Sequence, residues 1–92
     1  MIVRIATEGQ YQVPDDVYEE LNRLDNETVG AVESADEQRF AAAYGELLDL
    51  VRSRGTRLGE DDLQESALIL PPPDLTLAEA EHEFTGDGLL PD

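Results

Sequence analysis

A run of proline at positions 71, 72 and 73 restricts the fold of this chain more than any other feature of its sequence. Proline has no backbone N–H and a nearly fixed φ, so such a run fits neither the interior of a helix nor the ladder of a sheet. The apolar run Ala67-Leu68-Ile69-Leu70 stands directly before it, and a helical pattern begins a few residues after it. We therefore expect a strand over residues 67–70, a rigid elbow of polyproline type, and a last helix over about residues 77–84.

The residues around this elbow also predict how the two elements are placed. A continuous apolar run is typical of a strand that is covered on both faces or central in a small sheet. Thr76 and Glu79 have the T-x-x-E spacing of a capping box, with Asp74 as an alternative cap. The elbow should therefore end the sheet and start the last helix.

The first thirteen residues alternate between apolar and polar side chains, which predicts a β-hairpin. A three-residue loop would pair Ile5 with Tyr11 and Val3 with Val13, and so keep one face apolar. It would also give Gly9 the left-handed conformation that such loops need. We expect this hairpin and the strand near residues 67–70 to form one small antiparallel sheet of three strands.

Two amphipathic helices are expected between the hairpin and the elbow. The first opens at Pro14 and ends at Glu33, and the second starts at a capping box of Ser34 with Glu37 and ends before Gly55. Apolar residues recur every three or four positions in both, and the short connection predicts an antiparallel helical hairpin. The apolar stripes should pack on the sheet and on each other, although such a stripe can also dock a partner helix.

Residues 56–65 are polar and predict a connector with one helical turn at residues 60–63. Their acidic trio at positions 60 to 62 lacks the ligand spacing of a calcium loop and is expected to be a solvated face. Residues 1–92 are thus predicted to form a single α+β domain. In it, a small antiparallel sheet packs on an antiparallel helical hairpin and a short C-terminal helix.

The charge of the chain is strongly one-sided: 22 acidic residues stand against six basic ones, all arginine, for a net charge of −16. In dilute buffer such a surface repels itself, whereas molar salt shortens the Debye length to about 3 Å and screens the repulsion. The composition therefore indicates adaptation to high salt. The alternative is an acidic protein from a high-GC bacterium, whose genome also favours arginine over lysine. The scattered arginines form no basic stripe, so direct binding to nucleic acid or to an anionic membrane is not expected.

The sequence also limits the compartment of the protein. It contains no cysteine, which excludes disulfides and thiolate metal sites. Its N-terminus lacks the basic and apolar regions of a signal peptide, and no apolar stretch approaches the roughly 20 residues that span a bilayer. We expect a cytoplasmic protein that reaches the inner face of the membrane only through a partner.

Catalytic and cofactor-binding patterns are missing from the sequence. The single histidine, His82, lies at helical spacing from Glu79 and Glu83, but the Glu-x-x-His sites of di-iron bundles need further carboxylates from other long helices. The serines lack a nearby histidine, and there is no glycine-rich phosphate loop. We expect no enzymatic activity, no cofactor and no metal. A small-ligand or metal sensor that uses His82 remains an alternative.

Four stretches in order carry a resemblance to a known family. They are IVRIATEGQY at the start, the LNRLDNE segment, ALILPPPDLTLAEA and the following GDGLLP. Together they resemble PspAA, the PspA-associated protein family, over nearly the whole chain. The family accompanies PspA-type proteins in actinobacteria and haloarchaea. Those proteins are helical, membrane-remodelling relatives of the ESCRT-III machinery that act in envelope stress.

The resemblance implies a non-catalytic accessory or regulatory module that associates with a PspA-like coiled-coil protein. It implies no functional residues. A self-assembling domain, and hence a homo-oligomer, is a further alternative. For a partner surface we select the elbow and the tail, namely Pro71, Pro72, Pro73, Leu89 and Leu90, because a rigid apolar surface binds with a small ordering cost.

Overall fold

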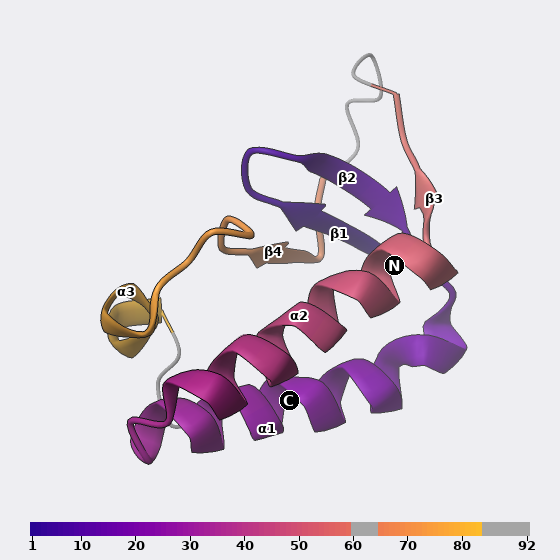
Figure 1. Cartoon of the computed structure of the whole chain (residues 1–92). Coiled ribbons are helices and arrows are strands. Elements are labelled where there is room, and N and C mark those ends of the chain that lie inside the picture. Colours follow the sequence, from indigo (N-terminus) through magenta and orange to yellow (C-terminus); the bar gives the residue numbers. More distant parts are fainter. Residues whose placement is uncertain (60–64, 84–92) are drawn as a thin grey trace.

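The computed structural model describes residues 1–59 and 65–83, which form a four-stranded sheet lying on a pair of long helices (Figure 1). The strands are β1 (Ile2–Ile5), β2 (Gly9–Gln12), β3 (Thr56–Arg57) and β4 (Leu68–Leu70). The helices are a 3-10 turn, η1 (Asp15–Val17), followed by α1 (Tyr18–Glu33), α2 (Glu37–Arg54) and α3 (Leu77–Glu83). The predicted α+β class, the helical hairpin and the short C-terminal helix are confirmed.

The sheet is mixed, so the prediction of a purely antiparallel sheet was wrong. Its order is β3-β2-β1-β4, in which β2 is antiparallel to both β1 and β3, whereas β4 runs parallel to β1. Parallel neighbours need a long crossover, and here the chain between β1 and β4 includes β2 and the helical hairpin. Because β4 stands last in the strand order, it is an edge strand and not a central one. Its Ile69 is 60% exposed.

The hairpin pairs Val3 with Tyr11 and Ile5 with Gly9, so the predicted register was wrong by two residues. The turn is closed by the backbone N–H of Glu8, which donates to the carbonyl of Ile5 at 3.0 Å. Thr7 takes a left-handed conformation with φ 70°, and Gly9, where we expected such a conformation, also has a positive φ, of 139°. The inward face is nevertheless the predicted one, because a shift of two residues leaves every side chain on its own side of the sheet.

The helical hairpin turns at residues 34–36, and Asp36 caps α2 instead of the predicted Ser34. Ser34 keeps a helical conformation and donates its N–H to the carbonyl of Gly30, so it ends α1 and does not start α2. Ala35 then turns the chain with φ 53°, and an Asp36 side-chain oxygen accepts the N–H of Arg39 at 3.1 Å. At the other helix, Pro14 is extended and precedes η1 instead of opening a helix.

Gly55 ends α2 as predicted. Its N–H donates to the carbonyl of Val51 at 2.9 Å, and a Cβ at this position would lie 2.4 Å from that oxygen. The next residues, expected to be a plain connector, form the short strand β3, which pairs with Tyr11 and Gln12 of β2. The predicted helical turn at residues 60–63 and its acidic trio lie outside the described residues.

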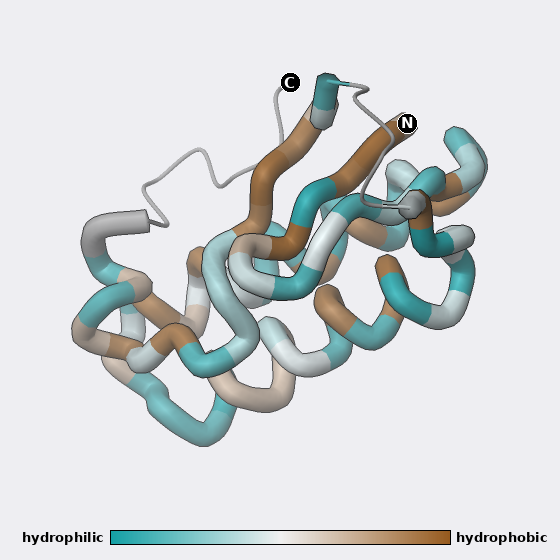
Figure 2. The backbone as a smooth tube through the Cα atoms, turned by 90° about the horizontal axis from the view of Figure 1, so that it is seen from above, coloured by the Kyte–Doolittle hydropathy of each residue, from teal (hydrophilic) through white to brown (hydrophobic). Residues whose placement is uncertain are grey.

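The hydrophobic core lies between the sheet and the helical hairpin. Figure 2 shows β1 and β4 as neighbouring apolar strands. The core side chains that these strands and β2 contribute are Val3, Ile5, Tyr11, Leu68 and Leu70. The helical hairpin contributes a larger set, which is Leu21, Leu24, Val29, Ala31, Val32, Phe40, Tyr44, Leu47, Leu48 and Val51. All helices of the described part are too short or too polar for a transmembrane span.

Candidate partner-binding site

The proline elbow is fastened to α2 by Tyr44. The Tyr44 hydroxyl donates a hydrogen bond of 2.5 Å to the carbonyl of Pro71, and Pro72 offers a second carbonyl at 3.4 Å. Pro71 is buried, Pro72 is half-buried and Pro73 is exposed. Of these three predicted residues, Pro73 lines the groove that is described next. Leu89 and Leu90 lie outside the described residues.

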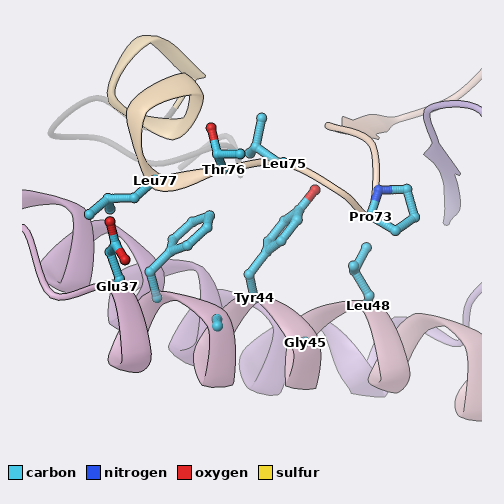
Figure 3. A pocket seen from close by; sticks show the side chains of 10 residues that line it. Glu37, Tyr44, Gly45, Leu48, Pro73, Leu75, Thr76 and Leu77 are labelled. Atoms are coloured by element: carbon cyan, nitrogen blue, oxygen red, sulfur yellow. The ribbon is translucent and has the colours of Figure 1, made fainter.

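A groove with a volume of about 400 Å³ runs between α2 and the chain that follows the elbow (Figure 3). We call it the α2 groove. Helix α2 lines it with Phe40, Ala41, Tyr44, Gly45 and Leu48. The opposite wall consists of Pro73, Leu75, Thr76 and Leu77, and Glu37 at the start of α2 completes the lining. Both walls are therefore mainly apolar.

Local interactions hold the second wall in place. The N–H of Leu75 donates to the carbonyl of Pro72 at 3.1 Å, which turns the chain after the elbow. Thr76 and Glu79 then form the predicted capping box. The Glu79 carboxylate accepts the N–H of Thr76 at 3.1 Å, and the Thr76 hydroxyl accepts the N–H of Glu79 at 3.3 Å. The wall thus leads directly into α3.

Two stacked aromatic rings form part of the α2 wall of the groove. Phe40 and Tyr44 lie one turn apart on α2, and their rings stack with centroids 5.6 Å apart and planes 11° from parallel. Gly45 has open space where a side chain would project, because a Cβ at this position would meet nothing within 4 Å. The missing side chain of Gly45 and the small side chain of Ala41 leave the groove open along α2.

The two hydroxyl groups of the lining are already engaged with the protein itself. The Tyr44 hydroxyl is used by the elbow, and the Thr76 hydroxyl donates to Glu79 at 3.0 Å. Glu37 is the charged residue of the lining. Sites for small polar ligands usually aim several polar groups at the ligand. The α2 groove is therefore chemically suited to apolar side chains.

A second cluster of charged groups joins the hairpin turn to the end of α2. The Glu8 carboxylate accepts hydrogen bonds from the Arg52 Nε at 2.9 Å and from the Tyr11 hydroxyl at 2.7 Å. The bonds from Arg52 and then Tyr11 lower the pKa of Glu8 to about 2, and Glu8 in turn raises the pKa of Tyr11. Arg57 donates to the backbone carbonyl of Glu8 at 2.8 Å. Every group is used to connect β1, β2, β3 and α2, so we assign the cluster a structural role.

No metal centre is found among the residues that the structure describes, since none of their carboxylates form a group of three or more that could hold a metal ion. The predicted helix around His82 is present as α3, but the side chain of His82 itself lies outside the described part. Glu79, its expected co-ligand, has its carboxylate on the N-terminus of α3.

The sequence pattern did not single out Ala41, Gly45, Leu75 and Leu77 as site residues. Two small residues four apart on the outer side of a helix were a usable signal, because such spacing lets another chain approach closely. Their partner wall lies some 30 positions further along the chain, and only the folded structure brings the two together. The small-residue spacing could thus have indicated half of the groove.

The fold and the groove define a small α+β domain with an acidic composition and one mainly apolar groove beside α2. Comparison with curated proteins and with solved structures gives no significant match. A family model does match: the chain belongs to PspAA, the PspA-Associated protein family, whose model covers residues 1–92. This confirms the resemblance, and the name of the family states association with PspA.

Proposed function

We propose that the protein is a non-catalytic accessory module that binds a PspA-like coiled-coil protein and regulates its assembly in a membrane or envelope stress response. The observation that carries this proposal is the match of the PspA-Associated family model to residues 1–92. The lining of the α2 groove supports it, because its engaged hydroxyl groups and mainly apolar walls suit a protein surface better than a small polar substrate.

The proposal places the protein at the membrane only through its partner. The net charge of −16 opposes direct contact with an anionic lipid surface, since both surfaces are negative. A cytoplasmic module held to the membrane by a PspA-like protein is consistent with this charge. The same charge supports the proposal that the protein works in high salt, where the repulsion is screened.

The test is co-purification. The tagged protein is expressed in its host and recovered in about 2 M KCl, a salt concentration that screens non-specific charge attraction. We expect the PspA-like protein of that host to be recovered with it. A tagged acidic protein of similar size and charge, but different fold, is the control for charge-driven capture. A correctly folded bait that recovers no PspA-like protein would refute the proposal.

Self-assembly is a second candidate function, and the exposed edge of β4 favours it. Ile69 is 60% exposed on this edge strand, and the described part of the sheet has no strand beyond β4. An uncovered edge can pair with the same edge of another copy. Light scattering in about 2 M KCl would show a dimer, and Ile69→Lys should then return it to a monomer. A monomeric wild type would exclude this function.

A further inference from the structure

We infer that the α2 groove receives one face of an amphipathic helix of the PspA-like partner, a helix that carries Lys or Arg beside its apolar residues. This inference rests on the proposed function and adds to it the surface and the chemistry of the partner. It is carried by the shape and lining of the groove together with the charges on its two walls.

The shape of the groove fits the side chains of a helix. Its lining follows α2 over residues 37–48, with Phe40, Tyr44 and Leu48 on one side and Leu75 and Leu77 on the other (Figure 3). A volume of about 400 Å³ accommodates a few large apolar side chains, as one face of a helix presents at positions i, i+3 and i+4. Gly45 and Ala41 allow the partner backbone to come close to α2.

The charges select the kind of helix. The stretches that form the two walls, residues 37–48 and 73–77, contain the carboxylates Glu37, Glu46 and Asp74 and one cation, Arg39. Glu46 lies near Arg23 of α1, so Glu37 and Asp74 are the carboxylates of the groove rim. The cation is already engaged, because Arg39 Nε lies 2.7 Å from Glu27 of α1. Glu37 lies in the lining itself, and Asp74 stands between the lining residues Pro73 and Leu75. The rim is therefore negative, and a helix flanked by lysine or arginine complements it.

Alternative occupants fit these observations less well. A second copy of this chain would bring another net charge of −16 to a negative rim. A small polar ligand would find the Tyr44 and Thr76 hydroxyls already bonded to Pro71 and Glu79. A basic amphipathic helix satisfies both the apolar walls and the acidic rim.

The test places one large side chain inside the groove and the same side chain outside it. Gly45→Trp places a large side chain on the α2 wall of the groove; its Cβ meets no atom within 4 Å, and the substitution removes a glycine from a helix interior. Ser53→Trp, on an exposed position of the same helix, is the matched control. Circular dichroism verifies that both variants are folded, and titration calorimetry measures their affinity for the purified PspA-like protein.

We expect Gly45→Trp to weaken binding by at least about tenfold, as for a blocked interface centre, and Ser53→Trp to change it by less than about twofold. If wild type and both variants bind equally well, the inference is overturned while the proposed function stands. If the folded wild type does not bind the PspA-like protein at all, the proposed function fails and the inference falls with it.

The charge of the partner is tested separately with fluorescent peptides that tile the helices of the PspA-like protein. The tightest-binding peptide should carry Lys or Arg beside an apolar stripe. The double variant Glu37→Lys with Asp74→Lys should weaken its binding several-fold at about 0.15 M KCl and much less at about 2 M KCl. A tightest peptide that is acidic, or a double variant without effect at low salt, would overturn the assigned chemistry.

Discussion

Glu8→Gln is the substitution with the most informative expected effect on stability. The Glu8 carboxylate lies at the tip of the hairpin and accepts hydrogen bonds from Arg52 of α2 and from Tyr11 of β2. Glutamine keeps the size of the side chain and one acceptor oxygen but removes the negative charge. The substitution therefore isolates the charge that connects the sheet to the C-terminal end of α2.

The magnitude follows from the pKa of Glu8 and the exposure of the pair. A fall of this pKa from 4.5 to about 2 corresponds to an upper limit of about 3 kcal/mol. Solvent screens part of this energy, because the Glu8 side chain is 21% exposed and that of Arg52 is 36% exposed. We therefore expect Glu8→Gln to lower the free energy of unfolding by about 1 to 2 kcal/mol at pH 7.

The assay is urea unfolding followed by circular dichroism at several pH values. Since the folded pKa of Glu8 is lowered, its ion pair stabilises the protein fully above the unfolded pKa of about 4.5, and this stabilisation disappears as the pH falls toward 2. Comparison of wild type with variant is essential, because acid also neutralises the other carboxylates of both proteins. The difference in unfolding free energy should be constant above pH 5 and vanish near pH 2.

Glu19→Gln is the matched control, because it removes one negative charge from an exposed carboxylate of α1. Relief of general repulsion should be offset by the loss of a carboxylate from the first turn of α1, so we expect this variant to change the free energy of unfolding by less than about 0.5 kcal/mol. If Glu8→Gln is no less stable than Glu19→Gln at pH 7, the ion pair contributes nothing. If the deficit of Glu8→Gln persists undiminished at pH 2, its cause is packing and the electrostatic reasoning is refuted.

Three further predictions concern the elbow, α3 and salt. Tyr44→Phe removes the hydroxyl that bonds to Pro71 and should lower the free energy of unfolding by about 1 to 2 kcal/mol in urea; an unchanged value would show that the elbow does not depend on this bond. Thr76→Ala removes the α3 cap and should destabilise α3 by about 1 kcal/mol, seen as faster amide exchange at Ala80, whereas exchange in α1 stays unchanged. The protein should be more stable at about 3 M than at about 0.1 M KCl by circular dichroism, and equal stability at both would contradict adaptation to salt.

Much of the fold could be predicted because it depends on neighbouring residues. The Thr76–Glu79 capping box, the end of α2 at Gly55 and the strand before the prolines follow from the backbone chemistry of a few consecutive positions. The α2 cap was missed because Ser34 and Asp36 both suit the role. Which of the two residues caps α2 depends on where the chain turns between the helices. Ala35 takes a left-handed conformation there, so Ser34 stays at the end of α1 and Asp36 starts α2.

The candidate site was predictable only in part. The elbow was selected from its rigidity, and the structure places Pro73 in the groove but buries Pro71 under Tyr44. The helical stripe of α2 was expected to pack internally or to dock a partner. Which of its neighbours form the groove depends on where the chain returns after β4, and no local pattern contains that information.

By itself, the sequence determined the types of the main elements, the proline elbow, the acidic surface and membership of the PspA-Associated family. These properties are set by side-chain chemistry and by short-range backbone preferences, which act before the chain is compact. The tertiary structure alone decided that β4 joins the sheet parallel to β1 at its edge, that Glu8 meets Arg52 across 44 positions, and that α2 and residues 73–77 enclose a groove. Each depends on distant segments burying apolar surface together, and several arrangements of the same elements satisfy the local preferences equally well.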